Sequence, residues 1–385
     1  MAPGRPTLLM RPYSTAYPDL VANGGELIAR AELLVDGVAQ RSTEDGSLGL
    51  KLTGGSITAD RTITGGGDTP QARPRQANLQ LVETDTASDD LATELAPTTG
   101  RELRITVGLS DTDLFTQGVF GVSSRRRRYE RGGWTWQLTG YDRSRRVARD
   151  RFTDAFQITA GAACSTLIDI VRSRIPFDID VVLEASSGCE LEETAFTVDA
   201  DPWAAVQKLA TAAGFFARFD ADGTFRTGPI VDDFDTPVWT YANETVTIER
   251  LELADDDTEA YNGVIVIGDG SFLLFPVRGE AWIEDPADPL YRYGSYGERP
   301  LIVRNGFVAT EDQANAAAAA QLNLLPGSGE IVTWNAAPNP AHELGDVFAV
   351  TLPDAGIDDR WVLDAYSLDL ATGAMSGTTR KRRSA

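Results

Sequence analysis

Histidine and cysteine are nearly absent from this 385-residue sequence, which contains one histidine and two cysteines. His342 stands in a Pro-Asn-Pro-Ala-His segment with no Gly-x-Ser-x-Gly motif near it, so a serine or cysteine hydrolase would lack its usual base. The same scarcity argues against a zinc site. Two cysteines cannot build a disulfide framework for a chain of this length, although a single bridge between Cys164 and Cys189 stays open. We expect no catalytic residues, no bound metal and no cofactor.

Long apolar runs are also missing. No stretch approaches the roughly 20 apolar residues of a membrane-spanning helix, so we expect no membrane-spanning segment. Residues 1–18 carry basic residues and four prolines but no continuous apolar core. This composition predicts an extended N-terminal arm and not a secretory signal.

Lysine is the third scarcity, because arginine supplies nearly all of the positive charge. A GC-rich genome and adaptation to high salt both account for this bias. The net charge is −22 and the pI is about 4.4. Such a surface repels nucleic acid phosphates, so we expect no specific binding of DNA or RNA.

Short alternating segments separated by turns fill the part of the chain up to residue 154. Asp36-Gly37 is a typical two-residue hairpin turn between two apolar stretches. Further strands are expected near residues 48–53, 56–63, 77–82, 102–109, 118–123 and 134–141. Residues 19–154 are therefore predicted to form a first β-barrel-like domain.

Helical spacing appears between residues 155 and 235. Residues 162–174 have apolar positions at helical intervals. A second helix has Asp201 as its N-cap, Pro202 at its first position and Gly214 after its end. A hairpin around Asp220-Ala-Asp-Gly223 follows. We expect a small α+β domain over residues 155–235.

Strand signals return over residues 236–378, which predicts a second β-barrel-like domain. One helix, capped by Thr310 and ending before Pro326-Gly327, interrupts these strands. Residues 379–385 are expected to form a frayed basic tail. The predicted fold class is mainly β, with two β-barrel-like domains flanking a small α+β domain.

The most concentrated charge is a cluster of arginines between residues 125 and 151. A nucleic-acid or anion site is one interpretation, since Trp134, Trp136 and Tyr141 lie nearby. A subunit interface facing a neighbour's carboxylates is the favoured one, because consecutive strand residues point to opposite faces. The expected interface residues are Arg125, Arg126, Arg127, Arg128, Arg143, Arg145 and Arg146.

Two further groups of residues are candidates for binding. Aromatic residues in an expected loop over residues 279–300 suggest a docking surface for a partner, or alternatively for a glycan: Trp282, Tyr291, Tyr293 and Tyr296. Acidic clusters at 255–259, 268–271 and 220–223 lack the regular spacing of a calcium loop, and a tight turn explains the last of them.

Three stretches resemble tail proteins of bacteriophages. Residues 118–152, with Trp-Gln-Leu-Thr-Gly-Tyr-Asp-Arg-Ser-Arg-Arg-Val-Ala, look like the N-terminal domain of minor tail proteins from actinobacterial phages. Residues 201–228, with Asp-Pro-Trp-Ala-Ala-Val-Gln-Lys-Leu-Ala, resemble the helix-hairpin module of baseplate hub and late-control tail proteins. Glu343-Leu-Gly-Asp-Val-Phe-Ala-Val is similar to the last barrel of that group.

This resemblance implies a non-enzymatic structural protein of the virion at the tail tip. Such hub proteins are homotrimers whose two barrel-like domains form a ring below the tail tube. They join the tube or distal tail ring, and the tape measure protein, to a spike or fibre, and genomic DNA passes through without specific binding. An acidic channel wall is the expected consequence of the net charge. A receptor- or carbohydrate-binding tip protein and a cell-wall hydrolase are the alternatives.

Overall fold

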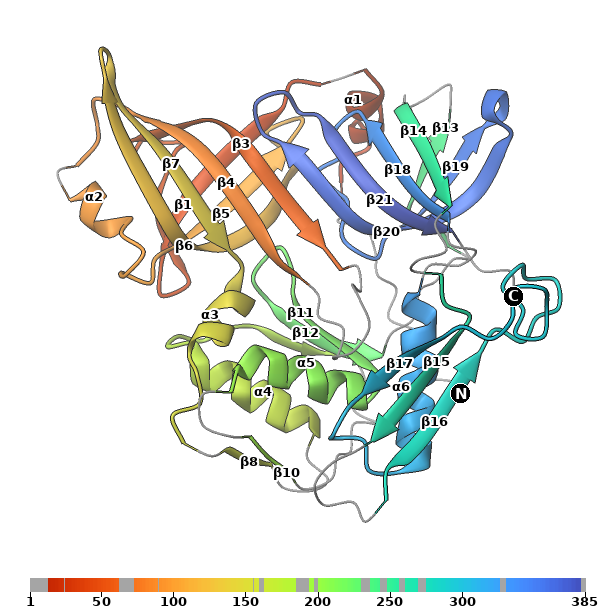
Figure 1. Ribbon diagram of the computed structural model, residues 1–385. Coiled ribbons are helices and arrows are strands. Elements are labelled where there is room, and N and C mark those ends of the chain that lie inside the picture. The colour runs from red at the N-terminus through yellow and green to blue at the C-terminus, as the bar shows by residue number, and fades with distance from the viewer. Residues whose placement is uncertain are drawn as a thin grey trace.

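Most of the chain belongs to β-sheets in the computed structural model (Figure 1). The structure describes residues 13–381 except 24, 62–72, 89, 155, 159–162, 185–193, 197–199, 230–235, 243–247, 256–259, 269–274 and 326–329. Within these residues, 13 strands form one large sheet. They are β1 (Ile28–Val35), β2 (Val38–Ser42), β3 (Leu50–Asp60), β4 (Arg73–Glu83), β5 (Glu102–Gly108), β6 (Leu114–Glu130), β7 (Gly133–Tyr141), β13 (Trp239–Ala242), β14 (Ile248–Asp255), β18 (Glu330–Ala336), β19 (Val347–Leu352), β20 (Ile357–Asp369) and β21 (Met375–Lys381).

Three small sheets and several helices make up the rest of the described residues. The small sheets pair β8 (Phe156–Ile158) with β10 (Thr194–Phe196), β9 (Val181–Leu183) with β11 (Phe215–Phe219) and β12 (Phe225–Pro229), and β15 (Gly263–Gly268) with β16 (Val277–Trp282) and β17 (Pro300–Arg304). The helices are α1 (Tyr17–Asn23), α2 (Leu91–Glu94), α3 (Arg143–Arg149), α4 (Ala163–Arg174), α5 (Pro202–Ala212), α6 (Glu311–Leu324) and the 3₁₀ turn η1 (Pro353–Ala355). None of the helices in this described part combines the length and apolar character needed to cross a bilayer.

The first β half, β1 to β7, confirms the expected hairpin turn. Val35 pairs with Val38 across Asp36-Gly37, and both turn residues have positive φ, 52° and 81°. This conformation matches the twist of the flanking strands, which explains the Asp-Gly pair. Beyond this hairpin, β1 pairs with β5, and the sheet continues through β6, β7, β4 and β3.

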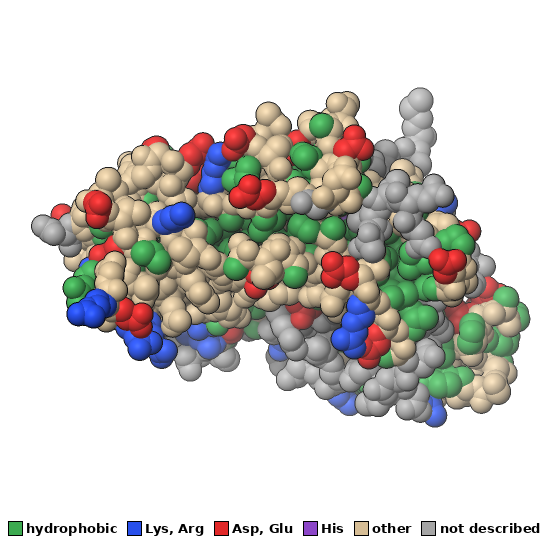
Figure 2. All heavy atoms as spheres, turned by 90° about the horizontal axis from the view of Figure 1, so that it is seen from above, with side chains coloured by type: hydrophobic (Ala, Val, Ile, Leu, Met, Phe, Trp, Pro, Cys, Tyr) green, Lys and Arg blue, Asp and Glu red, His purple; other side chains and the backbone are tan. Residues whose placement is uncertain are grey.

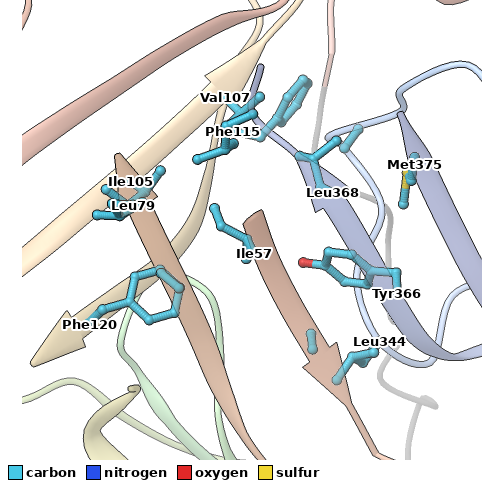
Figure 3. Close-up of a cluster of buried hydrophobic side chains, with 14 of the residues drawn as sticks. Ile57, Leu79, Ile105, Val107, Phe115, Phe120, Leu344, Tyr366, Leu368 and Met375 are labelled. Carbon is cyan, nitrogen blue, oxygen red and sulfur yellow. The ribbon is translucent and has the colours of Figure 1, made fainter. Parts of the chain in front are cut away.

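The two β halves are joined into one sheet by β3 and β20. Ile57 of β3 lies opposite Leu368 of β20 in an antiparallel register. The second β half contains β13, β14 and β18 to β21. Figure 3 shows Ile57, Leu79 and Phe120 of the first half near Tyr366, Leu368 and Met375 of the second. All six side chains belong to a single buried apolar cluster, so the halves share one core.

The predicted mainly β fold class is therefore confirmed. The expected domain boundaries, and closure of either β half into a barrel, stay predictions. Seen from above, hydrophobic side chains show in a strip between rims of tan atoms with scattered charged side chains (Figure 2).

A helical layer lies below the sheet and has its own core (Figure 1). The expected boundaries of α5 are confirmed, because Asp201 accepts hydrogen bonds from the Trp203 and Ala204 backbone N–H groups. Pro202 is the first helical residue, and Gly214 after the helix has a φ of 71°. Trp203 then stacks on Phe219 of the following hairpin with ring centroids 5.6 Å apart. The cap thus places the helix on the hairpin.

Helix α6 covers the β15–β16–β17 sheet. Its N-terminus has the expected Thr310 cap, and Gln313 completes a capping box. Gly279 of β16 has no room for a Cβ atom, which would lie 2.3 Å from the Ala314 carbonyl carbon of the helix. Close packing of helix on sheet therefore requires glycine at this position.

Both ends of the chain differ from the expectation. The extended arm was expected to reach residue 18, but Tyr17 and Pro18 begin α1, where a proline in the first turn costs no hydrogen bond. The basic tail was expected to fray from residue 379, but Thr379 to Lys381 complete β21. Arg380 is 5% exposed and its guanidinium binds the Asp364 carboxylate at 2.9 Å. This ion pair holds the end of β21 in place.

The Asp113 carboxylate holds the residues that precede α1. It accepts hydrogen bonds at 2.6 Å from both the backbone N–H and the hydroxyl of Ser14, and at 3.0 Å from Ser110. Burial by itself would raise the pKa of Asp113, but these hydrogen bonds outweigh it and lower the pKa.

Asp113→Asn is expected to lower the free energy of unfolding by about 1–3 kcal/mol at pH 7. Because the pKa of Asp113 is lowered in the folded state, its contribution is present above the unfolded value of about 3.9 and is lost as the pH falls through the folded value. Urea unfolding of both chains from pH 7 to pH 3 measures this. A difference that stays constant down to pH 3 contradicts the assignment.

Candidate functional site

Hydroxyl and amide side chains cover one face of six adjacent strands. On β4, Gln76, Asn78 and Gln80 alternate with the buried residues Ala77 and Leu79. The same alternation runs through β18, β21, β20, β3 and β7, which lie side by side across the front of Figure 1. We call these residues the polar face: Ser56, Thr58, Gln76, Asn78, Gln80, Thr135, Gln137, Thr139, Thr333, Asn335, Ser367, Ser376 and Thr378.

Charge is rare on this face, although the chain has a net charge of −22. Lys51, Asp60 and Asp369 lie at or next to the ends of β3 and β20. The flanking strands β14 and β6 add Arg250, Glu252, Arg126 and Arg128. A hollow of about 540 Å³ crosses the β3–β20 junction and is lined by Thr58, Gln76, Thr333, Asn335, Ser376 and Thr378 among others. The face can form hydrogen bonds with water, but it has few charges for an ionic ligand.

The expected arginine interface divides into three environments. Arg127 of β6 stacks on Trp134 at 4.0 Å and pairs with Glu83 at 2.6 Å. Arg125 lies 5.7 Å from the ring of Trp136, on the same side of the strand. Arg126 and Arg128 lie opposite Gln137 and Thr135, at the edge of the polar face. Alternation along the strand thus separates the four residues, as expected.

Arg143 is buried and already paired. It is 7% exposed, and its guanidinium donates to Glu102 at 2.8 Å and 3.1 Å and to the Gly223 carbonyl at 2.7 Å. This contact joins the first β half to the β11–β12 hairpin that follows α5. The guanidinium of Arg143 is therefore already bound within the chain and is not available to a neighbouring subunit.

Arg145 and Arg146 lie on α3 beside a recess of about 330 Å³. Arg101 and Arg149 line the same recess, which was not anticipated from the sequence because Arg101 is distant along the chain. The interface role of these arginines stays a prediction.

The aromatic residues of the expected docking loop form a small stacked group. The structure corrects the start of this loop, because Trp282 ends strand β16. Arg292 lies over Trp282 at 4.3 Å and over Tyr293 at 5.2 Å. Tyr296 is instead tied to the Ala260 carbonyl by a 2.8 Å hydrogen bond. Tyr293 is 68% exposed, so it is the member most open to a partner.

His342 is buried with Asp346 and Tyr241. Its Nδ1 lies 3.2 Å from Asp346 Oδ2, and its Nε2 lies 2.8 Å from the Tyr241 hydroxyl. His342 and Tyr241 are each 1% exposed and Asp346 is 2% exposed. Burial raises the pKa of Tyr241 above its ordinary range. A substrate cannot reach this group, which satisfies polar atoms within the core.

The acidic turn at residues 220–223 is a hairpin turn in the structure. Gly223 has a φ of 83°, and Asp220 pairs with Arg218 and Arg226. Within the described residues, no cluster of three metal-ligating side chains could hold an ion. The acidic positions 256–259 and 269–271 fall outside those residues, as does Cys189.

No family model matches this sequence, and no curated protein matches it. Solved structures do resemble it. The tail protein from Neisseria meningitidis MC58 is 16% identical, with 92% of this chain and 96% of that chain covered and a TM-score of 0.63. The 43 kDa tail protein of prophage MuSo2 from Shewanella oneidensis is 13% identical, with coverage of 92% and 98% and a TM-score of 0.60. Prophage tail protein gp18 from Listeria monocytogenes EGD-e is 9% identical, with coverage of 93% and 95% and a TM-score of 0.55. This chain therefore has the fold of these tail proteins over nearly its whole length.

Proposed function

We propose that this chain is a structural, non-enzymatic subunit of a viral tail, and that its polar face lines the channel through which DNA passes. The shared fold supports a structural role in a tail. The polar face is the observation that carries the channel assignment, because a sheet face of this width with few charges is unexpected in so acidic a chain.

The chemistry of the polar face suits transient passage of DNA. Phosphates bind to cationic side chains and are repelled by carboxylates. A channel wall with few charges of either sign therefore slows the passage of DNA least. Hydroxyl and amide groups keep ordered water at the wall without specifying a base sequence. In this proposal, a wall with few charges takes the place of the acidic wall expected from the net charge.

The assembly that we propose is a homotrimeric ring at the tail tip. Its two β halves would repeat around the axis and continue the tail tube or distal tail ring. The aromatic group around Tyr293 would contact a spike, a fibre or the tape measure protein, because an exposed aromatic side chain on a stacked support suits protein docking.

Gln80→Arg with Gln137→Arg tests the channel wall, because the two residues are neighbours across β4 and β7. Particles that contain the variant are expected to assemble but to eject DNA about tenfold more slowly or worse, since each copy adds two phosphate contacts. Time-resolved release of DNA from purified particles measures the rate.

The matched control is Asn23→Arg with Asn323→Arg, which adds the same charge at exposed positions on α1 and α6. The control should eject DNA at the wild-type rate. Ejection by the Gln80/Gln137 variant at the wild-type rate would show that the polar face does not line the channel.

A further inference from the structure

The recess beside α3 collects positive charge in an acidic protein. It has a volume of about 330 Å³ and lies where α3 meets the start of β5, the middle of β6 and the end of β7. Five arginines line it, and one of them, Arg143, is already paired with Glu102. The other four are Arg101, Arg145, Arg146 and Arg149. Its size suits a short peptide segment or a small anion.

None of these four guanidinium groups has an ion pair with a carboxylate of the described residues. Arg145 lies over the ring of Tyr141 at 4.1 Å, and its buried Nε has no hydrogen-bond partner. Arg146 donates to the Gly100 carbonyl at 3.3 Å. A buried donor without an acceptor is costly, and an anionic group in the recess would supply acceptors to these arginines.

The acidic residues in the wall of the recess are already engaged. Glu102 binds Arg143, and Asp142 accepts hydrogen bonds from the backbone N–H groups of Arg75 and Ser144. Asp150 lies 3.5 Å from Arg174. The positive charge of the recess is therefore available to an outside ligand.

A protein carboxylate fits this recess better than the DNA backbone does. Phosphates of a duplex follow one another along a strand and need an extended row of cations. Here four arginines converge on one recess, and a guanidinium pairs with a carboxylate through two parallel hydrogen bonds.

The chain itself offers a suitable acidic segment, Glu284–Asp288, which we call the acidic turn. The Glu284 side chain is exposed and has no ion pair with the described residues. The turn is held in shape, since Asp285 accepts from the Ala287 N–H at 2.9 Å and Asp288 from the Leu290 N–H at 2.8 Å. A preorganised segment loses little entropy on binding.

We propose that the acidic turn of one copy binds in the arginine recess of the next copy. In Figure 1, α3 lies at the left of the molecule, and the loop between β16 and β17 lies at the far right. Contacts between opposite sides of identical chains are heterologous, and they close into a ring when the rotation permits. The inference rests on the proposed ring and identifies the contact that would close it.

A charge exchange tests this contact. Arg149→Glu and Glu284→Arg should each weaken self-association of the full chain about tenfold or more, because each places like charges together. Combining both in one chain should restore the wild-type oligomer, since every contact joins one recess to one acidic turn. Mass photometry over a range of concentrations measures the oligomer fraction.

The matched controls are Arg172→Glu and Glu26→Arg, which reverse exposed charges that belong neither to the lining of the recess nor to the acidic turn and should leave self-association unchanged. An oligomer that persists in both single variants overturns the contact and leaves the ring intact. A wild-type chain that stays monomeric overturns the ring as well. Binding of a short DNA duplex that Arg149→Glu abolishes would assign the recess to phosphate and also overturn the proposal.

Discussion

Arg75→Ala is expected to lower the free energy of unfolding by about 3–5 kcal/mol, because the change removes the buried cation of an ion pair. Arg75 is 3% exposed on β4. Its guanidinium binds the Glu343 carboxylate and donates to the Tyr366 hydroxyl at 2.8 Å. Both partners belong to the second β half, so one side chain from the first half holds two segments of the other.

The electrostatics of Arg75 favour its charged form. Burial by itself would lower its pKa, but the neighbouring charge of Glu343 outweighs burial and raises the pKa. Guanidinium therefore stays protonated throughout the ordinary pH range. Its removal takes this charge away from the Glu343 carboxylate, near the junction of the halves.

Chemical denaturation monitored by tryptophan fluorescence measures the effect of Arg75→Ala. Arg250→Ala is the matched control, since Arg250 pairs with Glu252 at 3.3 Å while 72% of its side chain is exposed. Exposed pairs contribute about 0–1 kcal/mol, so this change should be nearly silent. Replacing Arg75 and Glu343 together by methionine should recover much of the loss, because both charges of the pair are removed together. Equal effects of Arg75→Ala and Arg250→Ala would contradict the assigned role.

Local structure was predictable from the sequence where a backbone conformation requires a particular residue type. Asp36-Gly37 satisfies a turn with positive φ, and Asp201-Pro202 satisfies the first turn of α5. These features depend on neighbours within four residues. Alternation of apolar and polar residues likewise indicated strands of the first β half.

Contacts between distant segments were not predictable in this way. The pairing of β3 with β20 joins residues about 300 positions apart, for example Thr58 with Ser367. Apolar alternation shows that a strand has a buried side but does not identify its partner strand. The polar face exists only because that pairing aligns the strands, so its extent emerged only from the fold.

The arginine cluster shows the same limit at a candidate site. Its members are close in sequence, yet Arg143 points into an ion pair with Glu102 while Arg145 lines the recess. Arg101, which directly precedes β5, also lines that recess. The clustering of arginines along the sequence indicated a functional surface. Which of these charges remain available to a partner depends on burial in the folded chain.

Phe348→Ala is expected to destabilise the protein by about 3–5 kcal/mol, because it opens a cavity among buried aromatic rings. Phe348 is fully buried on β19. Its ring centroid lies 5.2 Å from that of Tyr241, 5.5 Å from His342 and 5.9 Å from Trp334. Loss of the ring therefore removes packing from the His342–Asp346 pair as well as from the strands.

The effect of Phe348→Ala should extend into the first β half, because both halves share one apolar cluster. Hydrogen exchange should show lower protection on β4 as well as on β20, since a shared core couples their opening. Phe275→Ala makes the same chemical change where 81% of the residue is exposed, and it should alter stability by less than about 0.5 kcal/mol. If exchange accelerated in the second β half alone, the two halves would open independently, and the β3–β20 junction would not couple them.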